Sequence, residues 1–364
     1  MQKRKTTILI LCPYPPGQAP SQRFRFEQYL DSLREVGIEF ELRPFFDEPV
    51  WQHLYAKGKF LIKVYGLLRG LVKRLFTLIG VGKYDFVFIH REAAPIGPPF
   101  IEWVISKVFS KKIIYDFDDA IWLPNTSDEN KVISALKWHS KVKAICRWSH
   151  VISCGNTYLC DYASQYNPRV VLNPTTIDTN KLHNPGLHPS LHNSDGITLG
   201  WTGSHSTLKY LEGILPVVKM LEQEFPEQFK FVVVADKRQS FSLASLHFIP
   251  WNRETEIKDL VQFDIGLMPL TDDVWSQGKC GLKALQYMSL GIPTVASAVG
   301  VNRSILDHGV NGYLCSSEAD WKTSLMNLIR DPSMRRKMGL AAREKVISNY
   351  SVDSNKEKFL SLFS

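Results

Sequence analysis

The chain has 364 residues, which suits two domains of roughly 150 to 200 residues better than a single one. With 44% hydrophobic and 22% charged residues, its composition excludes a disordered protein. The net charge of +8 indicates anionic partners, and by itself it does not choose among phosphates, nucleic acid and an acidic membrane surface. The six cysteines form neither a CxxC pair nor zinc-type spacing, which favours a reduced, cytosolic setting.

The amino terminus is basic and then apolar, as in a secretory signal peptide. Its apolar run, residues 8–11, is too short for the apolar region of such a peptide, and no small-residue cleavage site follows. We therefore predict a first buried strand at this place. No stretch of the sequence is apolar for long enough to span a bilayer.

Short apolar runs with the character of doubly buried strands recur along the chain, and helix-like segments separate most of them. The predicted strands are residues 6–12, 86–90, 112–117, 150–154, 169–173, 197–203, 229–235, 263–269, 292–297 and 312–315, and the clearest helices are 26–36, 208–224, 282–289 and 319–329. This alternation predicts parallel sheets of the doubly wound, Rossmann-like kind. Because these strands are too many for one ordinary sheet, we expect two such domains, joined by the polar segment 181–196.

Ligands of such folds lie beyond the carboxyl ends of the strands, which directs attention to the loop and helix within residues 264–297. There Gly278, Lys279, Cys280 and Gly281 precede a predicted helix that starts at Leu282. Glycines before a helix let the backbone approach a ligand, and the free N–H groups of the first turn favour a phosphate. In the alternative interpretation the glycines only form a turn and Lys279 is a solvated surface residue.

The same stretch resembles the nucleotide-sugar site of glycosyltransferase family 4. Residues 286–297, QYMSLGIPTVAS, are similar to the end of the family motif, and the similarity continues through 300–315. The resemblance implies a GT-B fold with two domains facing a cleft, a UDP- or GDP-sugar donor, and transfer with retention of anomeric configuration. It also implies that Gly281 and Leu282 contact the donor phosphate together with Lys279.

Two positions depart from the family motif. Its first Glu, which usually contacts the donor sugar, falls on Gly278, and its second falls on Gln286. Gln286 could still accept hydrogen bonds from the ribose hydroxyls through its carbonyl oxygen. The resemblance places a second phosphate element at residues 200–211, where Lys209 matches the family's Lys and Ser204, after Gly203, takes the place of its Arg.

Three carboxylates lie close together where the predicted strand 112–117 ends: Asp116, Asp118 and Asp119. Like charges at this spacing indicate a ligand, a metal or basic partners. An Asp-x-Asp pattern is compatible with a metal, but the resembled family uses none, so we predict neither a metal nor a cofactor. The resemblance implies that Asp118, with Asp119, contacts the reacting sugar. The alternative is that these aspartates form an ion pair with a nearby Arg.

Other cleft candidates follow the strands of the amino-terminal half. Arg23 and Arg25 come after a Gly- and Pro-rich loop, and their spacing lets at most one of them meet an anionic substrate. His90 follows another strand, and a lone His at such a place is more often structural than functional.

The segment 51–83 is basic and amphipathic, since no acidic residue occurs between Pro49 and Tyr84. On a helical wheel five of its basic residues fall within an arc of about 140°, opposite its apolar residues. These five are Lys59, Lys63, Arg69, Lys73 and Arg74. Lys57 is a further basic residue of the same segment. This pattern is typical of a helix lying on an anionic membrane surface, while an ordinary surface helix is the alternative.

Together these observations predict domains at 1–185 and 195–345, with 346–364 packing back across the cleft. The predicted function is transfer of a sugar to a glycan or lipid-linked acceptor in cell-surface polysaccharide synthesis. We expect a cytoplasmic protein on the inner face of the cell membrane, with no nucleic-acid partner. A sugar-nucleotide epimerase of the same fold and an inactive nucleotide- or glycan-binding protein are the alternatives.

Overall fold

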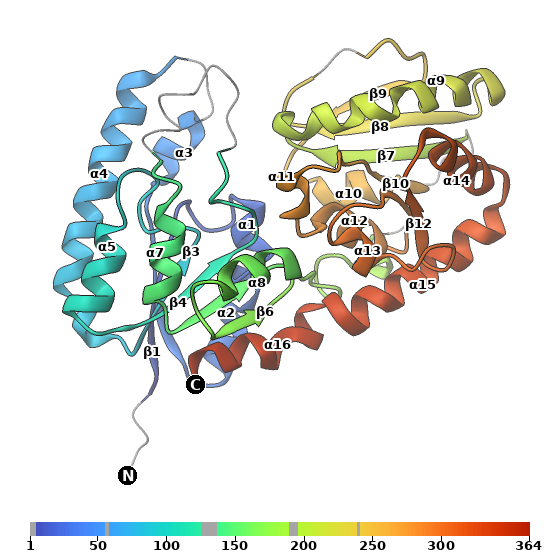
Figure 1. Cartoon of the computed structure of the whole chain (residues 1–364). Helices are drawn as coiled ribbons and strands as arrows, with labels where there is room; N and C mark the ends of the chain where they lie inside the picture. Colours follow the sequence, from blue (N-terminus) through green and yellow to red (C-terminus); the bar gives the residue numbers. More distant parts are fainter. Residues whose placement is uncertain (1–4, 55–57, 125–136, 189–195, 239–240) are drawn as a thin grey trace. The chain divides into compact units, whose positions relative to one another are not determined.

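The computed structural model describes residues 5–54, 58–124, 137–188, 196–238 and 241–364. Residues 55–57 of segment 51–83, with Lys57 among them, and residues 189–195 of segment 181–196 therefore lie outside the described residues. The chain forms two compact units (Figure 1). The first comprises Met1–Thr175, Gly278–Cys280 and Lys356–Ser364, and the second comprises Thr176–Gln277 and Gly281–Asn355.

The first unit is built on a six-stranded parallel sheet with the order β2-β1-β3-β4-β5-β6. Its strands are β1 Thr7–Cys12, β2 Glu39–Pro44, β3 Phe86–His90, β4 Lys112–Phe117, β5 Val151–Cys154 and β6 Val170–Leu172. The central strands β1, β3 and β4 are buried almost throughout, which explains their continuous apolar sequences. Strand β2, which the apolar pattern did not predict, lies at the edge of the sheet and is only half-buried.

Helices connect these strands, as expected for parallel neighbours. They are α1 Pro20–Arg23, η1 Glu27–Tyr29, α2 Leu30–Glu35, α3 Glu48–Leu54, α4 Phe60–Ile79, η2 Val81–Lys83, α5 Phe100–Trp103, η3 Val104–Val108, α7 Lys141–Trp148 and α8 Thr157–Ser164. The end of α16 (Val352–Leu360) and η7 (Ser361–Phe363) complete the unit. Phe359 stacks on Tyr29 with ring centroids 4.4 Å apart, and the Phe363 ring lies 6.1 Å from that of Phe88.

The second unit has its own six-stranded parallel sheet, with the order β12-β11-β10-β7-β8-β9. Its strands are β7 Ile197–Gly203, β8 Phe229–Ala235, β9 Leu246–Pro250, β10 Ile265–Met268, β11 Thr294–Ser297 and β12 Gly312–Cys315. Strand β9 is another half-buried edge strand that the sequence pattern missed. The prediction of two doubly wound parallel sheets is confirmed.

Helices again connect the strands of this sheet. They are η5 Pro185–Leu187, η6 His205–Ile214, α9 Leu215–Glu224, α10 Glu256–Leu260, α11 Val274–Gln277, α12 Leu282–Ser289, α13 Asn302–Ile305, α14 Glu318–Arg330 and α15 Pro332–Tyr350. One apolar core packs the β7–β8 side of the sheet against α9 and α14, with Trp201 and Leu325 fully buried in it. A second core around Phe263 and Tyr287 packs α12 against the sheet.

Helix α4, at the outer side of the first unit in Figure 1, packs on the rest of that unit through its small and basic side. Gly66 lies against Val50 and Gly70 against the ring of Phe45, so closely that a Cβ at either glycine would collide with these side chains. Beside them Arg74 is fully buried and donates hydrogen bonds to the carbonyl oxygens of Ala93, Arg43 and Cys12. Because the glycines let the helix come close, one arginine can donate hydrogen bonds to backbone carbonyl oxygens of three separate chain segments.

The expectation of one solvent-facing basic arc on this helix is wrong for Arg74. Arg69 and Lys73 both pair with Asp47, and the Arg69 side chain remains 49% exposed. Many apolar side chains of the helix also face solvent, whereas Leu67 and Leu71 pack against the core of the unit. The exposed set is Phe60, Leu61, Tyr65, Leu68, Val72, Leu75, Phe76 and Ile79. Within the described residues, every helix is too short or too polar to pass through a bilayer.

Candidate functional site

Polar side chains gather at the carboxyl ends of β3, β4 and β5 in the first unit. Asp116 at the end of β4 pairs with Arg25, accepts a hydrogen bond from the Ser153 hydroxyl at 2.6 Å and lies 2.8 Å from His90 Nδ1. All four side chains are almost completely buried. The Arg25 guanidinium also donates to the backbone carbonyl of Asn173.

The environment of Asp116 determines its charge. Burial alone would raise the pKa of this carboxyl, but the Arg25 guanidinium and the hydrogen bond from His90 outweigh it and hold the pKa well below its usual range. Asp116 is therefore ionised at neutral pH and fixed inside the unit. Because Arg25 and His90 are buried around it, their predicted contact with a substrate stays a prediction.

The two following aspartates form a second group, nearer the surface. Arg91, the residue after β3, donates to Asp118 Oδ1 at 2.8 Å and to Asp119 Oδ2 at 2.8 Å. Lys279 Nζ donates to Asp119 Oδ1 at 2.9 Å, within the same unit. Burial would raise the pKa of Asp119, but Lys279 and Arg91 lower it below its ordinary value. The ion-pair interpretation of these aspartates thus describes the structure, while their role toward a sugar stays a prediction.

The tripeptide Gly278–Cys280 belongs to the first unit, although the residues on either side of it belong to the second. Asn156 donates to the carbonyl of Lys279 at 2.9 Å, and the Cys280 thiol lies 3.1 Å from the carbonyl oxygen of Asp118. Burial raises the pKa of the Cys280 thiol, so it stays protonated at neutral pH. Across the described residues, no three or more His, Cys, Asp and Glu side chains are grouped so that they could hold a metal ion.

Arg23 is the more accessible of the two arginines after β1. Its guanidinium lies 5.0 Å from the centroid of the Phe24 ring, and its side chain is only half-buried. Because Arg25 is buried and pairs with Asp116, the two arginines are oriented differently, as their spacing requires.

In the second unit the carboxyl end of β7 leads into η6 through Gly203 and Ser204. Ser204 holds the N-cap position of η6, but its hydroxyl lies 2.8 Å from the Ser206 hydroxyl and makes no capping bond to the backbone. The Thr207 hydroxyl donates to the Ser204 carbonyl at 2.9 Å. Lys209 lies on η6 and is exposed, with its Nζ 5.3 Å from the centroid of the Tyr210 ring.

Helix α12 follows β10, and its first turn begins directly after Gly281. Gly281 has a φ of 68°, which favours glycine, and no side chain caps the helix. Leu282 and Lys283 are its first two residues. A helix start without a side-chain cap suits an anion, and the phosphate contact itself stays a prediction.

Gln286 lies farther along α12 and is buried, with 3% of its surface exposed. Its side-chain nitrogen lies 3.3 Å from Glu256 Oε1 and 3.4 Å from His183 Nε2. The contact of Gln286 with a ribose stays a prediction. Glu256 thus places a carboxylate beside Gln286, and no sequence spacing indicated it.

Sequence reasoning also missed Lys283, whose Nζ lies 3.3 Å from the Thr207 hydroxyl and 4.2 Å from the centroid of the Trp201 ring. Its position within residues 264–297, directly after Leu282, was the available signal. Arg91, the residue after His90, was not among the sequence candidates, although it pairs with both Asp118 and Asp119.

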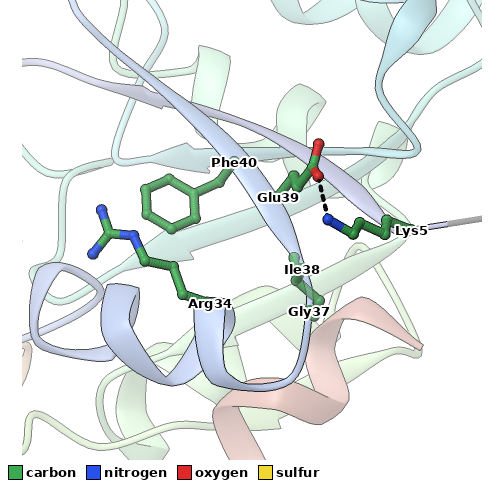
Figure 2. A pocket seen from close by; sticks show the side chains of 6 residues that line it. All are labelled: Lys5, Arg34, Gly37, Ile38, Glu39 and Phe40. Carbon is green, nitrogen blue, oxygen red and sulfur yellow. Dashed lines mark hydrogen bonds and ion pairs between the residues drawn. The ribbon is translucent and has the colours of Figure 1, made fainter.

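A cavity of about 400 Å³ lies elsewhere in the first unit (Figure 2). Lys5, Arg34, Gly37, Ile38, Glu39 and Phe40 line it. Because Glu39 begins β2, this cavity lies at the amino ends of the strands, opposite the edge that carries the candidate residues. We therefore exclude it from the functional site.

Comparison with known proteins finds a family match in the carboxyl-terminal part of the chain. Residues 196–331 match the family described as glycosyl transferases group 1. Over these residues, which make up less than half of the chain, the sequence is similar to that family. The group 1 segment contains both sequence elements assigned to the donor, the end of β7 and the start of α12.

Two curated proteins are similar to this chain over shorter stretches. The human alpha-1,3/1,6-mannosyltransferase ALG2 is 30% identical over 79 residues, and the N-acetyl-alpha-D-glucosaminyl L-malate synthase of Bacillus anthracis is 32% identical over 72 residues. These stretches cover 21% and 19% of this chain and 19% of each relative. The chain thus matches about a fifth of the length of these relatives.

Solved structures share the fold over nearly the whole chain. Sucrose-phosphate synthase from Thermosynechococcus elongatus superimposes with a TM-score of 0.72 at 14% identity, covering 99% of this chain and 98% of its own. Anabaena Alr3699/HepE, solved in complex with UDP and glucose, gives a TM-score of 0.63 at 14% identity and 98% coverage of both chains. Likeness at this identity shows the GT-B fold.

Proposed function

We propose that this protein is a retaining glycosyltransferase of family 4 that moves a sugar from a UDP- or GDP-sugar to a glycan or lipid-linked acceptor. The observation that carries the proposal is the group 1 match of residues 196–331, which contain the glycine-led, uncapped start of α12. A helix start of this kind binds phosphate oxygens through its N–H groups. The complex of Anabaena HepE with UDP and glucose supports UDP as the nucleotide.

The proposed roles follow the chemistry of the residues. Gly203, Ser204 and Lys209 contact the donor phosphates with the start of α12, and Lys279 adds positive charge. Asp118 and Asp119 face the sugar, where a carboxylate stabilises positive charge developing at the anomeric carbon. A leaving diphosphate oxygen assists deprotonation of the acceptor hydroxyl. In this proposal lysines and a helix end neutralise the diphosphate, so the reaction needs no metal and no cofactor.

Turnover of a panel of nucleotide sugars tests the proposal against its alternatives. Transfer to an acceptor, with the anomeric configuration of the product read by NMR, is the expected result. Conversion of one nucleotide sugar into another without an acceptor would instead establish an epimerase. Nucleotide binding without any turnover would establish an inactive binding protein. The relatives reported above bear the names of a transferase and synthases, which supports the first outcome.

We further propose that the protein lies on the inner face of the cell membrane and that α4 contacts an anionic lipid surface. More exposed large hydrophobic side chains lie on α4 than on any other described element, Leu61 being 80% exposed and Ile79 78% exposed. Helix α5, which packs against α4, adds the exposed Phe100 and Trp103. Since segment 49–84 has no acidic residue, anionic headgroups meet no repulsion there.

The orientation of α4 decides which substitutions test this contact. Because Arg69 and Lys73 pair with Asp47 and Arg74 is buried, the apolar side chains supply most of the proposed binding. Changing Leu61, Leu68 and Leu75 together to Gln should release the protein from anionic vesicles in a co-sedimentation assay. Val36→Gln, an exposed apolar residue of the same unit away from α4, is the matched control. Wild-type protein that stays in the supernatant at low salt would remove the membrane contact and the case for a lipid-linked acceptor.

A further inference from the structure

All six cysteines lie within the described residues, and Cys160 differs from the others in its environment. It is partly exposed, whereas the other five are buried. Burial raises the pKa of each of these five thiols, which keeps them protonated at neutral pH. The pKa of the Cys160 thiol is lowered instead, because the Cys154 thiol donates a hydrogen bond to its sulfur. Cys160 is therefore the cysteine with the greatest thiolate character.

The turn between β5 and α8 brings these two thiols together. Cys154 ends β5, and Cys160 is the fourth residue of α8, which packs against that strand. The Cys160 N–H donates to the Asn156 carbonyl at 3.1 Å, and the Asn156 side chain caps the helix by accepting from the Leu159 N–H at 2.9 Å. Because the thiols are already in hydrogen-bond contact, a disulfide between them requires only a local movement. An accessible thiolate beside a second, buried thiol is the arrangement typical of redox-sensing cysteines.

The loop between the two cysteines also holds part of the candidate site. The Asn156 side chain donates to the Lys279 carbonyl at 2.9 Å, and the Lys279 ammonium group donates to Asp119 at 2.9 Å. All of these groups belong to the first unit. A disulfide that draws Cys154 and Cys160 together therefore acts on the residue that fixes the backbone of Lys279.

This loop is packed tightly against the tripeptide 278–280. At Gly155 a Cβ would lie 2.3 Å from the Cys280 sulfur and 3.3 Å from the Cα of Asp118. Such a close approach leaves no free space between the loop and the tripeptide. A change in the loop is therefore passed on to the tripeptide, and Lys279 is displaced with it.

We propose that Cys154 and Cys160 form a redox site, at which oxidation to an internal disulfide displaces Lys279 and weakens donor binding. The Cys160 thiolate attacks a low-molecular-weight disulfide such as oxidised glutathione, which gives a mixed disulfide and releases one glutathione thiolate. The Cys154 thiol gives up its proton to the departing glutathione, and its sulfur displaces the second glutathione from Cys160. The two cysteines thus lose two electrons and two protons, and one oxidised glutathione becomes two glutathione thiols. The effect on donor binding rests on the proposed function, whereas the disulfide does not.

Peptide mapping of the full chain tests the disulfide. After incubation with oxidised glutathione, the unreduced protein is alkylated, digested with trypsin and analysed by mass spectrometry. We expect peptide 148–169, which contains both cysteines, to lose two hydrogen atoms and to resist alkylation, and dithiothreitol to reverse both changes. Cys160→Ser should abolish this product. Cys315→Ser is the matched control and should keep it, because Cys315 is a buried cysteine of the second unit whose sulfur contacts the Ser324 hydroxyl.

Calorimetric titration of UDP and GDP tests the effect on the donor. Oxidised wild-type protein should bind the nucleotide about tenfold more weakly than reduced protein, which is the loss expected for one charge-assisted contact to phosphate. Cys160→Ser should bind it with the affinity of the reduced wild type, with or without oxidised glutathione. Near-ultraviolet circular dichroism establishes that both variants are folded.

The outcomes distinguish this inference from the proposed function. Thiols that stay open to alkylation, or a Cys160 that stops at the mixed disulfide with glutathione, overturn the redox site whatever the protein binds. A disulfide that leaves nucleotide affinity unchanged overturns the displacement of Lys279. Reduced wild-type protein that binds neither UDP nor GDP overturns the proposed function and the effect on donor binding, while the peptide map still decides the disulfide.

Discussion

The carboxyl-end edges of the two sheets share a topology and differ in chemistry. In the first unit the charged side chains are paired with one another: Asp116 with Arg25, and Asp118 and Asp119 with Arg91. In the second unit the same edge presents hydroxyls, lysines and a helix start without a side-chain cap. The comparison teaches that the first edge is a preorganised polar structure, while the second is suited to receive an anion.

The energetic consequences of the two arrangements are opposite. A buried ion pair contributes little net stability while it is intact, yet removing one partner leaves a costly unpaired charge. A lysine beside a helix start instead gives its largest contribution when a ligand is bound. Substitutions in the buried Arg25–Asp116 pair should therefore affect folding, and those of the lysines assigned to the donor should affect binding.

The largest effect is expected for Asp116→Ala, which leaves the buried Arg25 without its carboxylate. Loss of one partner of a buried pair costs about 3 to 5 kcal/mol in the free energy of unfolding, measurable by urea denaturation. Asp259→Ala is the control, since Asp259 is a buried carboxylate of the second unit that accepts a hydrogen bond from Thr255. Equal destabilisation by both substitutions would contradict the special role of the Arg25–Asp116 pair.

A smaller effect is expected at the lysines that the family motif indicates. Lys209→Ala and Lys279→Ala should each weaken nucleoside-diphosphate binding tenfold or more, since each removes a contact of about 1.5 to 3 kcal/mol. Isothermal titration calorimetry measures the change, with Lys219→Ala, at an exposed lysine of α9, as the control. Unchanged affinity in a folded Lys279→Ala protein would exclude that lysine from the donor site.

Lowering the pH should reduce the free energy of unfolding through the paired carboxylates Asp116 and Asp119 of the first unit. The pKa of Asp116 and of Asp119 is lowered in the folded protein, so both bind a proton more readily when unfolded. Their contribution to stability is complete above the unfolded pKa of about 3.9 and is lost as the pH falls below it, at about 1.4 kcal/mol for each unit of pKa shift. Urea unfolding at several pH values should show this loss in the wild type and a weaker pH dependence in Asp116→Asn.

The smallest effect is expected from metal removal. If lysines and the start of α12 neutralise the diphosphate, transfer should proceed unchanged in the presence of EDTA. Comparison of initial rates with and without the chelator measures this. Complete loss of activity that manganese restores would show that a metal holds the donor and would reverse the roles proposed for the aspartates.

The sequence predicted the buried parts of the fold better than its edges. Strands β1 and β3 are continuous apolar runs because both faces of a parallel sheet are covered. Strands β2 and β9 are edge strands with mixed exposure, so their sequences lack such a run. Helix α4 was identified as amphipathic, but its orientation depends on Gly66 and Gly70 fitting against the unit, and helical periodicity does not contain this information.

The candidate site shows the same limit. A motif identified the start of α12 because its glycines follow one another in the sequence. Lys283 has its significance only through Thr207 and Trp201, which precede it by more than seventy residues and meet it by folding. The pairing of Arg91 with Asp118 and Asp119 likewise arises because β3 and β4 are neighbours in the sheet.

The packing of residues 356–364 in the first unit has a consequence for the order of synthesis. Phe359 and Phe363 cover Tyr29, Phe86 and Phe88, yet the ribosome makes them only after the whole second unit. Domains near the amino terminus generally fold first during translation, but here the last aromatic contacts of the first unit must wait. Until they form, the nascent chain carries an uncovered aromatic surface, and chaperones are expected to bind it there.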